Sequence, residues 1–82
     1  MSVAILYFEA HGEIHEHDAF HPILFLVING NGFVRVGGPQ AEILKVSAGD
    51  AVLWPAKVLH KAWTNGEPMQ AIAIEYLNPA QA

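Results

Sequence analysis

The residues of this sequence best suited to chemistry are its histidines. Four of the five lie between positions 11 and 21, and the fifth, His60, stands alone in the second half of the chain. If residues 14–19 form a strand, His15 and His17 point to one face, because alternate residues of a strand share a face. Two imidazoles from one strand and one from a facing strand would offer a transition metal three nitrogen ligands. The alternative is a set of solvated surface histidines, since acidic residues are interleaved with them.

Short apolar runs separated by turn-forming residues must position these histidines. The runs are rich in β-branched and aromatic residues and cover residues 2–9, 14–19, 23–29, 33–37, 41–47, 51–54, 58–64 and 69–77. Glycine, proline and asparagine stand between them, as in the expected turn at residues 29–32. No window keeps helical spacing over a helix's length. The sequence therefore predicts one all-β domain over residues 1–82, a barrel or sandwich of about eight strands.

The composition limits what this domain can be. Of its 82 residues, 52% are hydrophobic and 15% are charged, and the mean hydropathy is +0.27. Such a chain is too apolar to be disordered and slightly apolar for a monomer. Small domains often complete their cores by association, so we expect a homodimer. The chain has no cysteine, which excludes disulfides and thiolate zinc sites.

The distribution of charged and apolar residues argues against two classes of partner, nucleic acids and membranes. The formal net charge is −4, and the four basic residues are scattered singly, whereas nucleic-acid-binding proteins carry a clustered basic face. The longest apolar run, residues 23–28, is far shorter than the roughly 20 residues needed to span a bilayer. The N-terminal segment lacks the basic region of a secretory signal. We expect a soluble cytoplasmic protein that binds neither nucleic acid nor membranes.

A motif precedes the isolated histidine. Gly49 is followed after five residues by Pro55, and His60 comes after four more. This pattern resembles the second motif of the cupin superfamily, which reads Gly, five residues, Pro, one residue, Gly, two residues, His, three residues, Asn. Lys57 occupies the second glycine position, where it requires a turn geometry that glycine adopts more readily. Asn65 arrives one residue late.

The first cupin motif can be aligned in two registers. Its pattern is Gly, five residues, His-x-His, three or four residues, Glu, six residues, Gly. With Gly30 in the last position, His17 falls on a ligand position, but Ala19 and Ile23 occupy two others. The glycine spacing favours this register.

The second register keeps more ligands. It takes His15 and His17 as the histidine pair and places His21 in the glutamate position. Pro22 predicts a break or bend next to His21. Metal chemistry favours this register, and both remain open at this point.

The resemblance covers nearly the whole chain and is strongest from Ile23 to His60. It is a resemblance to small single-domain bacterial cupins, and it implies a double-stranded β-helix barrel that is commonly a homodimer. Cupins often bind zinc, iron, nickel, copper or manganese. Ligands here would be His17 and His60, together with His15 or His21.

The resemblance also implies a pocket and a range of functions. Four residues are expected to line the pocket: Trp54, Phe25, Ile23 and Ala19. The alternative for the aromatic members is plain core packing. The implied function is binding of a transition metal and a small oxygenated molecule, with chemistry of the dioxygenase or isomerase type. The alternatives are a metal-free small-molecule-binding or sensory cupin, and a purely structural module.

Overall fold

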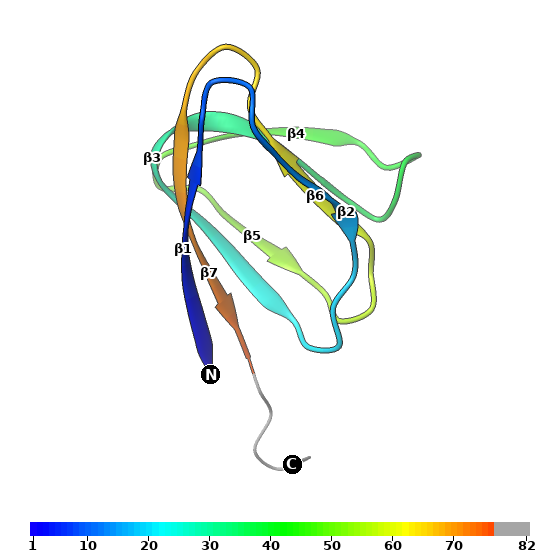
Figure 1. Ribbon diagram of the computed structural model, residues 1–82. Helices are drawn as coiled ribbons and strands as arrows, with labels where there is room; N and C mark the ends of the chain where they lie inside the picture. Colours follow the sequence, from blue (N-terminus) through cyan, green and yellow to red (C-terminus); the bar gives the residue numbers. More distant parts are fainter. Residues whose placement is uncertain (77–82) are drawn as a thin grey trace.

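The structure, a computed structural model, describes residues 1–76 as seven antiparallel β-strands (Figure 1). The strands are β1 (Ser2–Phe8), β2 (Glu13–His17), β3 (Ile23–Val36), β4 (Ile43–Ser47), β5 (Ala51–Trp54), β6 (His60–Trp63) and β7 (Met69–Glu75). Residues 1–76 contain no helix, and hence none that could cross a membrane. The all-β prediction is confirmed. The strand predicted over residues 69–77 ends at Glu75 in the structure, and residue 77 lies outside the described residues.

The long strand β3 belongs to two sheets. Its first half pairs with β7 and β5, and its second half pairs with β6 and β4. The first sheet, here called sheet A, has the order β1-β7-β3-β5, and sheet B has the order β2-β6-β3-β4. Figure 1 shows β3 as the curved ribbon, cyan and then green, that connects the two. This one strand therefore fixes how the sheets face each other.

The turn expected at residues 29–32 is instead a bend within β3. The register against β7 shifts between Val27 and Asn29, which marks a β-bulge, and Gly30 has a φ of 77°. A Cβ atom at Gly30 would collide with the carbonyl oxygen of Pro68, so only glycine fits this close approach. Glycine and asparagine here permit a bulge and a sharp change of direction. Two predicted strands thus become one, and the count is seven.

The core lies between the two sheets and draws on both. Its buried members are Phe8, Phe25, Val27, Val34, Val46, Trp54, Ala62, Met69 and Ala71. Each larger apolar side chain among them contributes about 1.5–3 kcal/mol relative to an exposed position. Because the inward faces of both sheets supply this core, neither sheet buries its apolar face without the other.

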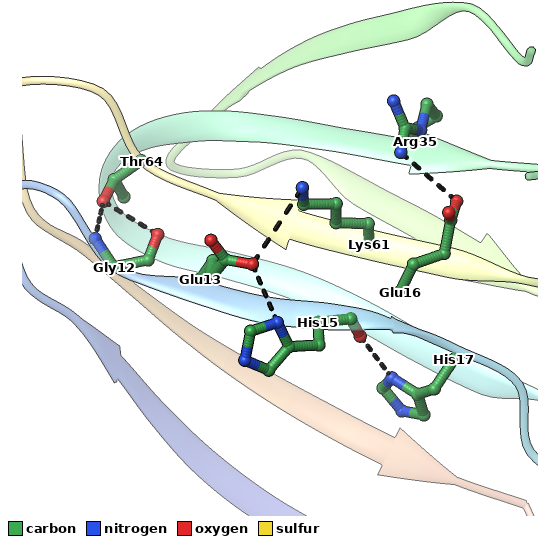
Figure 2. Close-up of polar contacts among 8 residues, drawn as sticks. All are labelled: Gly12, Glu13, His15, Glu16, His17, Arg35, Lys61 and Thr64. Carbon is green, nitrogen blue, oxygen red and sulfur yellow. Dashed lines mark hydrogen bonds and ion pairs between the residues drawn. The ribbon is translucent and has the colours of Figure 1, made fainter. Parts of the chain in front are cut away.

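A buried threonine holds the loop before β2 in place. The Thr64 hydroxyl donates to the carbonyl oxygen of Glu9. It also accepts the Gly12 N–H at 2.9 Å, as Figure 2 shows. The Thr64 N–H in turn donates to the Gly12 carbonyl oxygen at 3.0 Å. These bonds join the start of β2 to the end of β6. They therefore set the position at which the histidine-bearing strand begins.

Candidate functional site

A β-bulge in β2 decides which of its histidines approaches β6. Ile14 pairs with Ala62 and His17 pairs with His60, so two residues of β2 oppose a single residue of β6 between these pairs. A bulge of this kind resets the alternation of side chains along the strand. Ile14 therefore packs against the core and His17, three residues later, contacts His60. The simple alternation that grouped His15 with His17 is broken at this point.

His17 and His60 form the centre of the site. Their Nε2 atoms are 3.3 Å apart, and their rings meet edge to face with centroids 4.5 Å apart. His60 is only 1% exposed, whereas His17 lies at the solvent-accessible surface. The pair thus combines a buried imidazole with one that solvent can reach.

The backbone of β2 fixes the tautomer of His17. Its Nδ1 lies 2.7 Å from the carbonyl oxygen of His15, as Figure 2 shows. A carbonyl oxygen only accepts, so Nδ1 carries the proton and donates it. In the neutral ring the lone pair is then on Nε2, the atom next to His60. Metal-binding histidines are commonly oriented by this kind of bond on the far nitrogen.

His60 is held neutral by its surroundings. Its ring stacks on Trp54, with centroids 4.0 Å apart, and Trp54 stacks on Phe25 at 4.7 Å. Burial lowers the pKa of His60, and the neighbouring His17 lowers it further, against smaller opposite effects from the Val58 backbone and Asp18. Within the described chain, His60 Nδ1 is buried without a hydrogen-bond partner. A neutral imidazole is the form that binds metals.

The other two predicted histidines do not join this pair. The side chain of His15 is 91% exposed, and its Nδ1 lies 3.0 Å from a carboxylate oxygen of Glu13 (Figure 2). His21 is partly buried in the bend before Pro22. Among residues 1–76, no group of three or more histidine, aspartate or glutamate side chains is placed to hold a metal ion. The structure therefore brings together two of the four predicted ligands.

The predicted pocket residues divide between core and surface. Trp54 and Phe25 are buried core residues, which agrees with the core interpretation of these aromatics. Ile23 packs against the core from the first position of β3, where it pairs with Trp54. Ala19 lies in the loop after β2, and its carbonyl oxygen accepts the Lys57 N–H at 2.6 Å.

A small cleft lies in the loop region that follows His17. Asp18, Ala19, Phe20 and Lys57 line this cavity of about 380 Å³. Phe20 is 82% exposed, and the Lys57 ammonium lies 5.9 Å from the centre of its ring. The sequence interpretation did not assign Asp18 or Lys57 to a site. Lys57 alone carried a signal, because it stands where the cupin motif has glycine.

Lys57 retains the backbone conformation of the glycine that it replaces. Its φ is 62°, and it is the only non-glycine residue with positive φ in the described part of the chain. Side chains other than glycine are strained there, and such strain concentrates at functional sites. The turn geometry expected for the motif is therefore present, with a cation at its tip.

Comparisons with known proteins identify the architecture through structure alone. No protein-family model matches the sequence, and no curated protein matches it. Solved structures do match. A cupin superfamily protein from Desulfitobacterium hafniense superposes with a TM-score of 0.82 at 16% identity, over 93% of this chain and 66% of the other.

Two further structures agree with this result. An uncharacterized double-stranded β-helix protein from Klebsiella pneumoniae has a TM-score of 0.82 at 22% identity, over 95% of this chain and 68% of its own. A predicted oxalate decarboxylase from Thermotoga maritima has a TM-score of 0.82 at 14% identity, over 93% and 65%. The chain thus spans about two thirds of the length of these proteins. At these identities the likeness establishes a shared fold.

Proposed function

We propose, starting from the cupin fold that this chain adopts, that it is a small-molecule-binding protein whose site is the His17–His60 pair. In this proposal the two Nε2 atoms bind one divalent transition metal. The cleft in the loop after His17, lined by Asp18, Ala19, Phe20 and Lys57, receives a small oxygenated molecule. The fold alone does not select this function, since similar barrels carry unrelated chemistries.

The separation of the two Nε2 atoms is the observation that carries the proposal. Two imidazole nitrogens bound at about 2.0–2.1 Å to one tetrahedral zinc ion lie about 3.3–3.4 Å apart. The observed distance is 3.3 Å. The two nitrogens are thus already at the spacing that a shared metal requires.

The protonation of both rings supports the same conclusion. His17 donates from Nδ1 to the His15 carbonyl oxygen and so presents the Nε2 lone pair. Burial keeps His60 neutral near pH 7 by lowering its pKa. Imidazole ligands suit zinc, copper, nickel or iron better than magnesium or calcium. A metal so held would supply Lewis acidity toward an oxygen atom of a ligand.

The chain's own residues supply the remaining features of the site. Trp54 stacks on the ring of His60 and is itself stacked on Phe25, so this aromatic stack holds His60 in place. The cleft begins at Asp18, directly after His17, and offers the Lys57 ammonium and the Phe20 ring to a ligand. Catalytic metal sites usually have three protein ligands, so we propose binding rather than turnover as the primary function.

A metal-free binding protein is the second candidate. It is favoured by the two-histidine ligand set, since residues 1–76 hold no group of three potential ligands. Without metal, the protonated Nε2 of neutral His60 donates directly to Nε2 of His17 across their 3.3 Å separation. The same hydrogen-bonded pair then provides a fixed polar surface against which a small molecule can bind.

Calorimetric titration of untagged protein with ZnCl₂ and NiCl₂ separates the two candidates. We expect one ion per chain, bound at least about 10-fold more weakly after His17→Ala. His15→Ala is the matched control, because His15 lies on the same strand with a side chain that is 91% exposed. Absence of binding, or equal weakening by both substitutions, would refute the metal site and leave the metal-free candidate.

A further inference from the structure

The β-bulge in β3 turns the side chain of Asn29 to the outer face of sheet A. Val27 pairs with Ala71, and both are fully buried on the inner face. In a regular strand Ile28 would pair with Gln70 and Asn29 would point inward, because alternate residues share a face. The extra residue lets Asn29 pair with Gln70 instead, and Asn29 is exposed. Bulges re-aim side chains in this way and are over-represented next to functional sites.

Gln70 and Tyr7 continue this row toward the edge of the sheet. Gln70 lies between two buried residues of β7, so its own side chain points outward. On its other side Gln70 pairs with Tyr7, which is 77% exposed although the next residue, Phe8, is buried. Residues that oppose each other directly have Cβ atoms about 4.5–5.5 Å apart. One aromatic ring and two carboxamides therefore lie side by side across β1, β7 and β3.

These three side chains line a cavity of about 300 Å³ at the end of sheet A. Glu67, in the loop before β7, lines it as well. Asn31 holds the carboxylate of Glu67 in place by donating from Nδ2 to Oε2 at 2.9 Å. The remaining oxygen of this carboxylate can accept a hydrogen bond from a ligand. The smallest ligand pockets measure about 300 Å³, so this cavity suits a molecule of one small ring.

The charges around the cavity disfavour an anionic ligand. Among the described residues, Glu67 is the one charged group that lines the cavity. None of the four basic residues lines it, and all four lie in the described part of the chain. A phosphate or carboxylate would therefore be repelled by Glu67, with no cation to offset the repulsion. The ligand must be neutral or cationic.

The two carboxamides favour a neutral ligand that carries hydroxyl groups. Each carboxamide has an oxygen that accepts hydrogen bonds and an NH₂ group that donates them. A hydroxyl group both donates and accepts, so it can pair with either end of Asn29 or Gln70. An ammonium group only donates, and it would leave both NH₂ groups without an acceptor. The exposed ring of Tyr7 adds a flat apolar surface that covers C–H groups.

We propose that this cavity binds one neutral sugar ring. The C–H face of the sugar packs on the ring of Tyr7. Its hydroxyl groups form hydrogen bonds with the carboxamides of Asn29 and Gln70 and with the carboxylate of Glu67. The cavity is small and contacts only one side of such a ligand, so the dissociation constant is about millimolar.

The sugar cavity is separate from the histidine pair. The end of β7 at Glu75 lies in the same row of sheet A as Trp54, which stacks on His60. Gln70 comes five residues earlier in β7, so about 17 Å of strand separates the two regions. In Figure 1 the cavity end of β7 lies at the top, next to the loop that joins β6 to β7. Sugar binding therefore does not depend on the proposed metal site.

NMR titration of the isotope-labelled chain tests the proposal, with methyl α-glucoside, methyl α-mannoside and methyl β-galactoside each added to about 50 mM. We expect at least one glycoside to shift the side-chain amide signals of Asn29 and Gln70 until they saturate. Tyr7→Ala should weaken this binding at least about 5-fold, whereas Tyr7→Phe keeps the ring and should stay within about 3-fold of the wild type. Tyr76→Ala is the matched control, since Tyr76 is 43% exposed but follows the far end of β7.

Three results would overturn the proposal. The first is that no glycoside gives a saturable shift, and the second is that Tyr76→Ala weakens binding as much as Tyr7→Ala. The third is an equal shift with glycerol, which has hydroxyl groups but no ring to pack on Tyr7. A well-dispersed spectrum shows that each variant is folded, as expected for substitutions of exposed side chains. His17→Ala should bind the glycoside with unchanged affinity, so a failure of the metal site leaves this test intact.

Discussion

The imidazole of His60 lies flat on the indole of Trp54, with ring centroids 4.0 Å apart and planes inclined by 15°. Trp54 is itself 2% exposed and stacks on Phe25 at its other side. The buried histidine of the candidate site is therefore an extension of the hydrophobic core. Changes to the core are transmitted directly to the site.

Trp54→Phe should cost about 1 kcal/mol or less of the free energy of unfolding. The smaller ring loses packing, but the substitution also removes an indole N–H that is buried without a hydrogen-bond partner in the described chain. Trp54→Ala should cost about 3–5 kcal/mol, because it leaves a cavity. Urea denaturation measures both values. Equal losses would show that the stack on His60 contributes nothing specific.

The stability of the metal-free protein should fall as the pH is lowered through about 6.5. The folded-state pKa of His60 is lowered by burial, so the unfolded chain binds more protons in the window between the lowered pKa and the ordinary one. This contribution is fully present above that window, and each pH unit within it costs up to about 1.4 kcal/mol.

Urea denaturation in EDTA from about pH 8 to about pH 5 measures this dependence. The slope should become shallower in His60→Leu, which has no proton to bind at this position. A wild-type slope of the opposite sign, or one unchanged by the substitution, would contradict the assignment of a neutral buried imidazole.

Lys57→Gly should stabilise the fold by about 1 kcal/mol, because the lysine is held at a φ of 62° that glycine adopts without strain. Lys45→Gly is the matched control. It removes a lysine from the middle of β4 and should destabilise by about 0.5–1 kcal/mol. Thermal unfolding of both variants tests the difference in sign. If Lys57→Gly also weakens ligand binding, the strained lysine contributes its ammonium to the site.

The local signals predicted the strands well but missed two features that depend on distant partners. Residues 29–32 have the composition of a turn. Only the close approach of Gly30 to Pro68, far along the chain, reveals a bend. The bulge in β2 likewise exists only in relation to β6, since it is the pairing of His17 with His60 that defines it.

The candidate site, like the strands, was predicted in part. The motif spacing identified His17 and His60, and the structure places them in contact. The grouping of His15 and His21 with them depended on an unbroken alternation, which the bulge interrupts. Lys57 was visible only as a departure from the motif. Its positive φ follows from the turn that the rest of the motif builds.

The pairing of β1 with β7 has a consequence for synthesis. Strand β1 pairs only with β7 among the described strands. β3 also pairs with β7, so sheet A is incomplete until β7 has been synthesised. Contacts between residues so far apart in sequence form slowly. During translation, the apolar β1 segment therefore leaves the ribosome long before its partner exists. Until Glu75 has emerged, the β1 segment of the nascent chain lacks its partner strand, and an exposed apolar segment of this kind is prone to aggregation.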